Sequence, residues 1–88
     1  MKKVIVYFSE HCKDCGPLKA ALDEAGIKYA AVDISSGMFP LKQFLKYRDH
    51  RAEFDPIKEK GQVGVPCIVV NDGEQILFSV PEDLDILR

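Results

Sequence analysis

The stretch that decides the fold is residues 4–26, VIVYFSEHCKDCGPLKAALDEAG. Its first five residues form an unbroken apolar run rich in β-branched and aromatic side chains, which is typical of a strand buried on both faces. Further along, apolar residues repeat at the spacing of one helix face: Leu18, Ala21, Leu22 and Ala25. Gly26 is well suited to end such a helix. The stretch therefore predicts a strand followed by an amphipathic helix.

The residues that follow extend this pair into a larger α/β unit. Residues 27–32 are mostly apolar and predict a second strand, which is parallel to the first because a crossover helix joins the two. A second helix is expected to begin near Pro40, since proline suits the first helical turn. Residues 51–60 predict a further helical piece with Asp55 as its N-cap and Gly61 beyond its end.

The last third of the chain contains the one predicted hairpin. Residues 67–70 are a short apolar strand, residues 71–73 (Asn-Asp-Gly) are a turn signal, and residues 75–78 form the returning strand. Residues 81–87 predict a short closing helix. Together the elements predict an α/β fold with a mixed four-stranded sheet flanked by helices, in a single domain over residues 1–88.

The charge and hydropathy of the chain exclude several classes of protein. Twelve Lys and Arg against fourteen Asp and Glu give a formal net charge of −2, so the chain lacks the basic surface of a nucleic-acid-binding protein. No apolar run approaches the about 18 residues that a membrane span requires. The apolar run after Lys3 is also too short for a secretory signal. We therefore expect a cytoplasmic protein, without a membrane partner, and we expect it to be a monomer.

The remaining charged and aromatic side chains have simple structural interpretations. Four basic residues lie on or just after the expected second helix, and we interpret them as a solvated helix face: Lys42, Lys46, Arg48 and Arg51. The alternative is that they steer an anionic partner toward the site. His50 is expected at the surface. Five aromatic residues at strand or helix spacing are expected to pack in the core or at its edge: Tyr7, Phe39, Phe44, Tyr47 and Phe54.

A Cys-x-x-Cys pair, Cys12 and Cys15, lies where the first strand ends and the first helix begins. The thiolate is the reactive form of cysteine, and the free N–H groups of a helix N-terminus stabilise an anion. Lys13 and a protonated His11 favour a thiolate at Cys12, whereas Asp14 opposes it. The charged neighbours argue against deep burial of the pair. We expect Cys12 to attack a disulfide and Cys15 to resolve the product.

Several alternatives to redox chemistry remain open. The third cysteine, Cys67, is expected near the pair, either as an ordinary buried strand residue or as a third reactive thiol. A set of three cysteines with His11 has the composition of a zinc site. The pair is inert if both of its sulfurs pack in the core. The last alternative is a non-catalytic protein of the same fold that binds a partner through residues 40–61.

The chain resembles the glutaredoxin family of the thioredoxin-fold superfamily in three features. They are the Cys12–Cys15 pair after the first strand, Val65-Pro66 before the third strand, and the hairpin turn at residues 71–73. The resemblance covers nearly the whole chain and implies a thioredoxin-like fold and a dithiol oxidoreductase that reduces protein or low-molecular-weight disulfides. It implies a cis peptide bond before Pro66 and pairing of the Val65 main chain with the substrate. We expect Cys12 and Cys15 to be catalytic, and four residues to bind substrate: His11, Lys13, Val65 and Pro66.

The chain also departs from the pattern of the family it resembles. Lys13 and Asp14 stand where glutaredoxins usually carry Pro-Tyr, and Glu10 stands where many carry a lysine that holds a glutathione carboxylate. Leu77 and Phe78 fall where Gly-Gly usually lets glutathione approach the backbone. Glutathione is therefore a possible reductant but is expected to be a poor one, with a reductase protein as the alternative. We expect no tightly bound cofactor. The alternative is a module that carries an iron–sulfur cluster between two subunits, which needs the same glutathione site.

Overall fold

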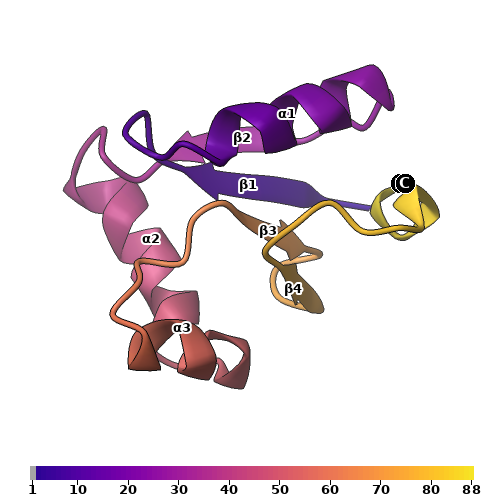
Figure 1. Ribbon diagram of the computed structural model, residues 1–88. Coiled ribbons are helices and arrows are strands. Elements are labelled where there is room, and N and C mark those ends of the chain that lie inside the picture. Colours follow the sequence, from indigo (N-terminus) through magenta and orange to yellow (C-terminus); the bar gives the residue numbers. More distant parts are fainter. Residues whose placement is uncertain (1) are drawn as a thin grey trace.

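The centre of the protein is a four-stranded sheet, described by a computed structural model that covers residues 2–88 (Figure 1). Its strands lie in the order β2-β1-β3-β4. Their bounds are β1 (Val4–Phe8), β2 (Ala30–Asp33), β3 (Cys67–Val70) and β4 (Gln75–Leu77). β1 pairs in parallel with β2 and antiparallel with β3, and β3 pairs antiparallel with β4. The predicted mixed sheet is confirmed, and β3 begins and ends at the predicted residues.

Helices cover both faces of this sheet. The α-helices are α1 (Cys15–Glu24), α2 (Met38–Arg48) and α3 (Asp55–Glu59), and two 3₁₀ helices are η1 (Ala52–Phe54) and η2 (Leu84–Leu87). α1 lies on one side of the sheet, and α2 and α3 lie on the other (Figure 1). The arrangement is the thioredoxin-like fold expected from the sequence. Within residues 2–88, none of the helices has the length and apolar character that crossing a membrane demands.

Two apolar clusters hold the layers together, one on each face of the sheet. The α1 cluster contains Val4, Val6, Leu18, Leu22, Ile27, Ile68, Val70 and Leu87. The α2 cluster contains Tyr7, Ile34, Phe44, Phe54, Cys67, Val69 and Ile76. Neighbouring residues of β1 and β3 divide between the two clusters because successive side chains of a strand point to opposite faces. Both central strands are therefore buried on both sides, as their unbroken apolar sequences predict.

The β3–β4 hairpin turns through two residues with left-handed backbone conformations. Asn71 and Asp72 have φ values of +49° and +59°, which these two residue types tolerate better than most. The N–H of Gly73 then donates to the carbonyl oxygen of Val70 over 3.1 Å. Arg51 Nη1 donates to the carbonyl oxygen of Gly73 over 2.6 Å, so this arginine fixes the turn instead of belonging to a solvated face.

Two predictions about the helices on the α2 side are wrong. Asp55 is not an N-cap, because η1 leads directly into α3 and Asp55 is already the first residue of that helix, with Phe54 before it. Phe39 is not packed but 73% exposed. The reason is that α2 turns Leu41 and Phe44 toward the sheet, and Phe39, two positions before Leu41, therefore lies on the opposite face of the helix.

The second strand and the closing helix are both shorter than predicted. β2 begins only at Ala30, while Ile27 packs in the α1 cluster without joining the sheet. The closing helix is the single 3₁₀ turn η2, whose start is capped by Asp83 through the N–H of Asp85 over 3.0 Å. Neither change disturbs the residues around the cysteine pair, which lie at the opposite end of β1.

Candidate active site

The loop between β1 and α1 carries Cys12, and Cys15 follows it as the first residue of α1. The loop turns tightly, because the N–H of Cys12 donates to the carbonyl oxygen of Ser9 over 3.0 Å. Helix α1 begins at Cys15 and has Asp14 as its N-cap residue, without a hydrogen bond from the Asp14 side chain. The predicted helix start beside the pair is confirmed. Cys12 itself lies three residues before the helix, so only Cys15 is helical.

The Cys12 thiol faces the segment that leads into β3. Its Sγ donates a hydrogen bond to the carbonyl oxygen of Val65 over 3.6 Å. The Val65–Pro66 peptide bond is cis, as the family resemblance implies. The side chain of Cys12 is half-buried and Pro66 is buried beside it. Segments 53 residues apart in the sequence therefore meet at one accessible sulfur atom.

Cys15 is in a different environment from Cys12. Only 1% of its surface is exposed, so the expectation that charged neighbours keep both sulfurs near the surface is wrong for this residue. Burial, followed by the hydrogen bond with the Cys12 side chain, raises the pKa of Cys15 to about 11. The backbone of Ser9 and the Lys19 ammonium, which lies 3.6 Å from the centre of the Phe8 ring, favour the thiolate but do not overcome burial.

Cys67 is fully buried in the α2 cluster, together with Tyr7 of β1 and Phe44 of α2. Burial raises the pKa of its thiol to about 12, so this sulfur stays protonated at neutral pH. Among residues 2–88, no three His, Cys, Asp or Glu side chains are grouped so that they could hold a metal ion. The four residues considered as a zinc site, Cys12, Cys15, Cys67 and His11, are thus not gathered into one.

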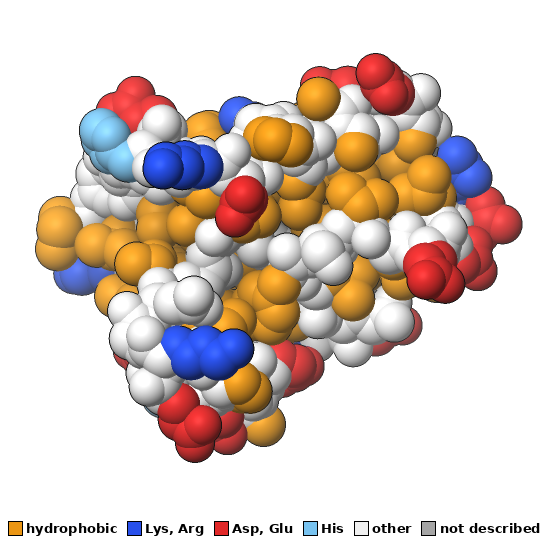
Figure 2. Space-filling view, viewed as in Figure 1, with side chains coloured by type: hydrophobic (Ala, Val, Ile, Leu, Met, Phe, Trp, Pro, Cys, Tyr) orange, Lys and Arg blue, Asp and Glu red, His pale blue; other side chains and the backbone are white. Residues whose placement is uncertain are grey.

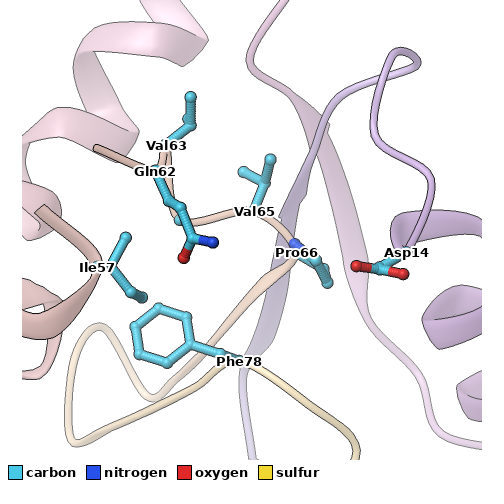
Figure 3. Close-up of a pocket in the computed structure, with 8 residues that line it drawn as sticks. Asp14, Ile57, Gln62, Val63, Val65, Pro66 and Phe78 are labelled. Carbon is cyan, nitrogen blue, oxygen red and sulfur yellow. The ribbon is translucent and has the colours of Figure 1, made fainter. Parts of the chain in front are cut away.

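A cleft of about 430 Å³ lies on one side of the Val65–Pro66 segment (Figure 3). We name it the Phe78 cleft, and its lining includes Asp14, Ile57, Gln62, Pro66 and Phe78. The Phe78 ring is held in place by an edge-on contact with Phe54, with ring centres 5.0 Å apart. Leu77 instead packs against the α1 cluster. Of the two bulky residues that the sequence singled out, only Phe78 therefore narrows this cleft.

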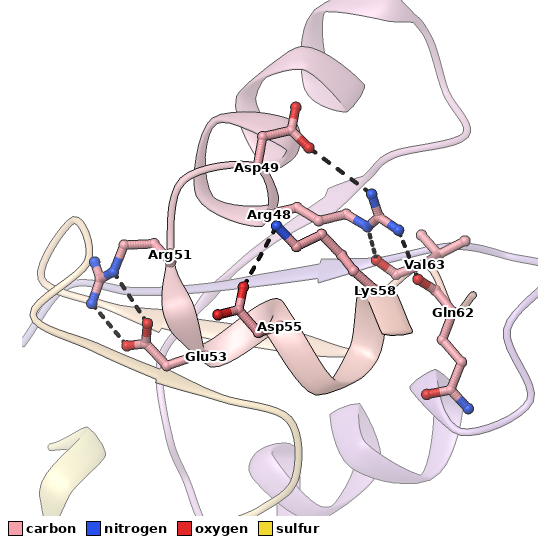
Figure 4. Close-up of polar contacts among 8 residues, drawn as sticks. All are labelled: Arg48, Asp49, Arg51, Glu53, Asp55, Lys58, Gln62 and Val63. Atoms are coloured by element: carbon pink, nitrogen blue, oxygen red, sulfur yellow. Dashed lines mark hydrogen bonds and ion pairs between the residues drawn. The ribbon is translucent and has the colours of Figure 1, made fainter. Parts of the chain in front are cut away.

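Arg48 fixes the loop that carries Val65 (Figure 4). Its Nε donates to the carbonyl oxygen of Val63 over 2.8 Å, and its Nη2 donates to that of Gln62 over 2.9 Å. The side chain is 24% exposed, so the prediction that Arg48 belongs to a solvated helix face is wrong. Lys42 and Lys46 on the same helix are exposed as predicted, and so is His50.

The part of the chain that carries this site also matches a known family. The family model described as Glutaredoxin matches residues 4–76, which include both paired cysteines and the Val65–Pro66 bond. The chain belongs to the glutaredoxin family. A relative from Haemophilus influenzae, described as an uncharacterized protein, is 39% identical over 77 residues, which span 88% of this chain and 90% of the relative.

This glutaredoxin-family protein carries its charged loop residues at the surface. The side chain of His11 is 79% exposed, and its Nε2 lies 3.5 Å from a carboxylate oxygen of Glu10. Lys13 is exposed as well. His11 lines a second cleft, beside Cys12, together with residues that no sequence motif identifies, among them Leu41 and Val63. The substrate contacts of His11 and Lys13 remain predictions.

Proposed function

We propose that the protein is a small thiol–disulfide oxidoreductase that reduces protein or low-molecular-weight disulfides through the Cys12–Cys15 dithiol. The observation that carries this proposal is the contrast between the two sulfurs. Cys12 is accessible and hydrogen-bonded to the Val65 carbonyl, whereas Cys15 is buried behind it and is in contact with the Cys12 side chain. An accessible sulfur backed by a sheltered one suits a two-step exchange reaction.

In the first step the Cys12 thiolate attacks one sulfur of the substrate disulfide. A bond forms between that sulfur and Cys12, the substrate S–S bond breaks, and the departing thiolate takes up a proton. In the second step Cys15 loses its proton and attacks the Cys12 sulfur, which forms the Cys12–Cys15 disulfide and releases the second substrate thiol. Two electrons and two protons pass from the dithiol to the substrate. The second attack is fast because it is intramolecular.

The surroundings of Val65 support binding of an extended substrate. In the part of the chain that the structure describes, the N–H of Val65 donates no hydrogen bond, and its carbonyl oxygen accepts only from the Cys12 thiol. Both groups are available to pair with the main chain next to the substrate disulfide, in the way strands pair at a sheet edge. Pro66 follows Val65 through the cis peptide bond and is buried. Val65 and Pro66 thereby act as substrate-binding residues in the proposal.

A complete cycle needs a reductant, and a thiol compound or a dithiol reductase protein supplies the two electrons that return Cys12 and Cys15 to the reduced state. The cytoplasm is the compartment in which such thiol pools keep a dithiol reduced, so the proposal places the protein there. We propose that it acts as a monomer, because Cys12, Cys15 and Val65 all come from one chain.

The test is to trap the intermediate with Cys15→Ser. This variant cannot resolve the first product, so a model disulfide substrate should leave one covalent adduct on Cys12, found by mass spectrometry of peptides. Cys67→Ser is the matched control, which changes an unpaired cysteine and should still turn over without accumulating an adduct. Adducts found mainly on Cys67, or turnover that survives Cys12→Ser, would show that the proposal is wrong.

A further inference from the structure

A second cleft, of about 450 Å³, lies against Cys12 on the side facing α2. We name it the Leu41 cleft. Its apolar walls are the side chains of Ile34, Leu41, Val63 and Val65, and the Cys12 side chain forms part of its lining. Serine side chains and His11 complete it, and within residues 2–88 no Asp, Glu, Lys or Arg side chain lines it. The size lies in the range of sites that enclose a ligand group.

Two walls of the Leu41 cleft come from alternate residues of one loop. Figure 3 shows the side chains of Val63 and Val65 directed away from Phe78, although both residues also line the Phe78 cleft. The Phe78 cleft and the Leu41 cleft thus lie on the two sides of one segment, which Arg48 holds through the carbonyl oxygens of Gln62 and Val63. Their chemistry differs, because the Phe78 cleft includes the Asp14 carboxylate.

Exposed apolar side chains gather at the rim of the Leu41 cleft. Val63 is 53% exposed. Met38 is 66% exposed, and it lies three residues before Leu41 in α2, which places both side chains on one face of that helix. Figure 2 shows hydrophobic side chains gathered at one end of the molecule, below the pale blue of a histidine and the blue of a Lys or Arg side chain. Exposed apolar side chains beside a reactive group are typical of a binding surface.

We infer that the Leu41 cleft binds an apolar side chain of a polypeptide substrate, two residues from the cysteine whose disulfide Cys12 attacks. This inference rests on the proposed function and names its substrate class. Because Cys12 lines the cleft, a side chain bound there lies close to the disulfide that Cys12 attacks, and we infer that both belong to the same polypeptide. In an extended segment, side chains alternate, so the residue two positions away faces the same side as the attacked cysteine.

The same geometry disfavours small charged disulfides. Glutathione disulfide carries several carboxylates, and placing one against Ile34, Leu41 and Val63 removes it from water without a cationic partner. On the other side of Val65, the Asp14 carboxylate repels an anion. An aliphatic side chain of a polypeptide carries no charge, so it loses no carboxylate hydration in the Leu41 cleft and is not repelled by Asp14.

The test compares two peptides of equal length, each with one cysteine in a disulfide with the same small thiol. One peptide has Leu two residues before and after the cysteine, and the other has Asp there. We expect the Leu peptide to oxidise the reduced protein about tenfold faster at low concentration, measured as a second-order rate constant. Glutathione disulfide should be slower than the Leu peptide.

Two variants test whether the faster reaction of the Leu peptide depends on the Leu41 cleft. Val63→Ser should reduce the ratio of the two rate constants to about threefold, because it removes part of the apolar wall. Phe39→Ser, an exposed apolar residue two positions from Leu41 and on the opposite helix face, should leave the ratio unchanged. Equal rates for the two peptides, or a faster Asp peptide, would overturn the inference while leaving the proposed function standing. Failure of every disulfide to oxidise Cys12 would instead refute the proposed function.

Discussion

Replacing Arg48 by Met tests whether this arginine positions the substrate-binding loop. The change removes two hydrogen bonds from a charged donor, to the carbonyl oxygens of Gln62 and Val63 over 2.9 and 2.8 Å. Buried hydrogen bonds of a charged group contribute about 1.5–3 kcal/mol each. Here the side chain is 24% exposed, and water can reach the released carbonyl groups, so we expect a combined loss of about 1–2 kcal/mol.

The measurement is thermal unfolding of Arg48→Met beside Lys46→Met. Lys46 lies on the same helix and is exposed, so its replacement controls for the loss of a positive charge and for the change in helix propensity. For a domain of this size the expected loss lowers the midpoint by about 5–15 °C. Arg48→Met should also raise KM for a peptide disulfide, because Val65 is held less firmly. Equal midpoints and equal KM values for the two variants would refute the reasoning.

Three further predictions concern the surroundings of the cysteines. Glutathione alone should reduce the oxidised protein slowly, and Phe78→Gly should accelerate that reduction by opening the Phe78 cleft; rapid turnover of the unchanged protein with glutathione contradicts this expectation. Gly64→Ala should lower the free energy of unfolding by about 1–3 kcal/mol, since Gly64 has φ +105° and an added Cβ would lie 3.0 Å from the Phe54 ring; an unchanged urea midpoint argues against it. The pKa of Cys67 is raised from 9.0 to about 12 in the folded state, so the stability it contributes is complete below pH 9 and is lost as the pH rises toward 12. The stability difference between the unchanged protein and Cys67→Ala should therefore narrow above pH 9, and a constant difference would count against the buried, protonated thiol.

Local sequence patterns predict best where one short segment determines its own structure. β3 was predicted to the residue because an apolar run is bounded by Pro66 and by the turn that begins at Asn71. The start of α1 beside the Cys-x-x-Cys pair follows from the same kind of local signal. The cis bond at Pro66 is different, since only the family resemblance pointed to it.

Features that depend on distant segments were not predictable in this way. The partners of Arg48 are 14 and 15 residues further along the chain, and nothing in the α2 sequence separates this arginine from its solvated neighbours. Phe39 and Phe44 lie on different faces of α2, and only the position of the sheet decides which face is covered. Cys15 is buried although Lys13 and Asp14 before it are exposed, because its side chain points inward where α1 begins.

The unequal burial of the three cysteines has a practical consequence. Cys15 and Cys67 have 1% and 0% of their surfaces exposed, and only Cys12 is accessible. An alkylating dye or spin label added to the reduced, folded protein should therefore attach at one position without any prior mutagenesis. A label attached at Cys12 lies beside the proposed substrate site, so binding of a polypeptide there should change its signal.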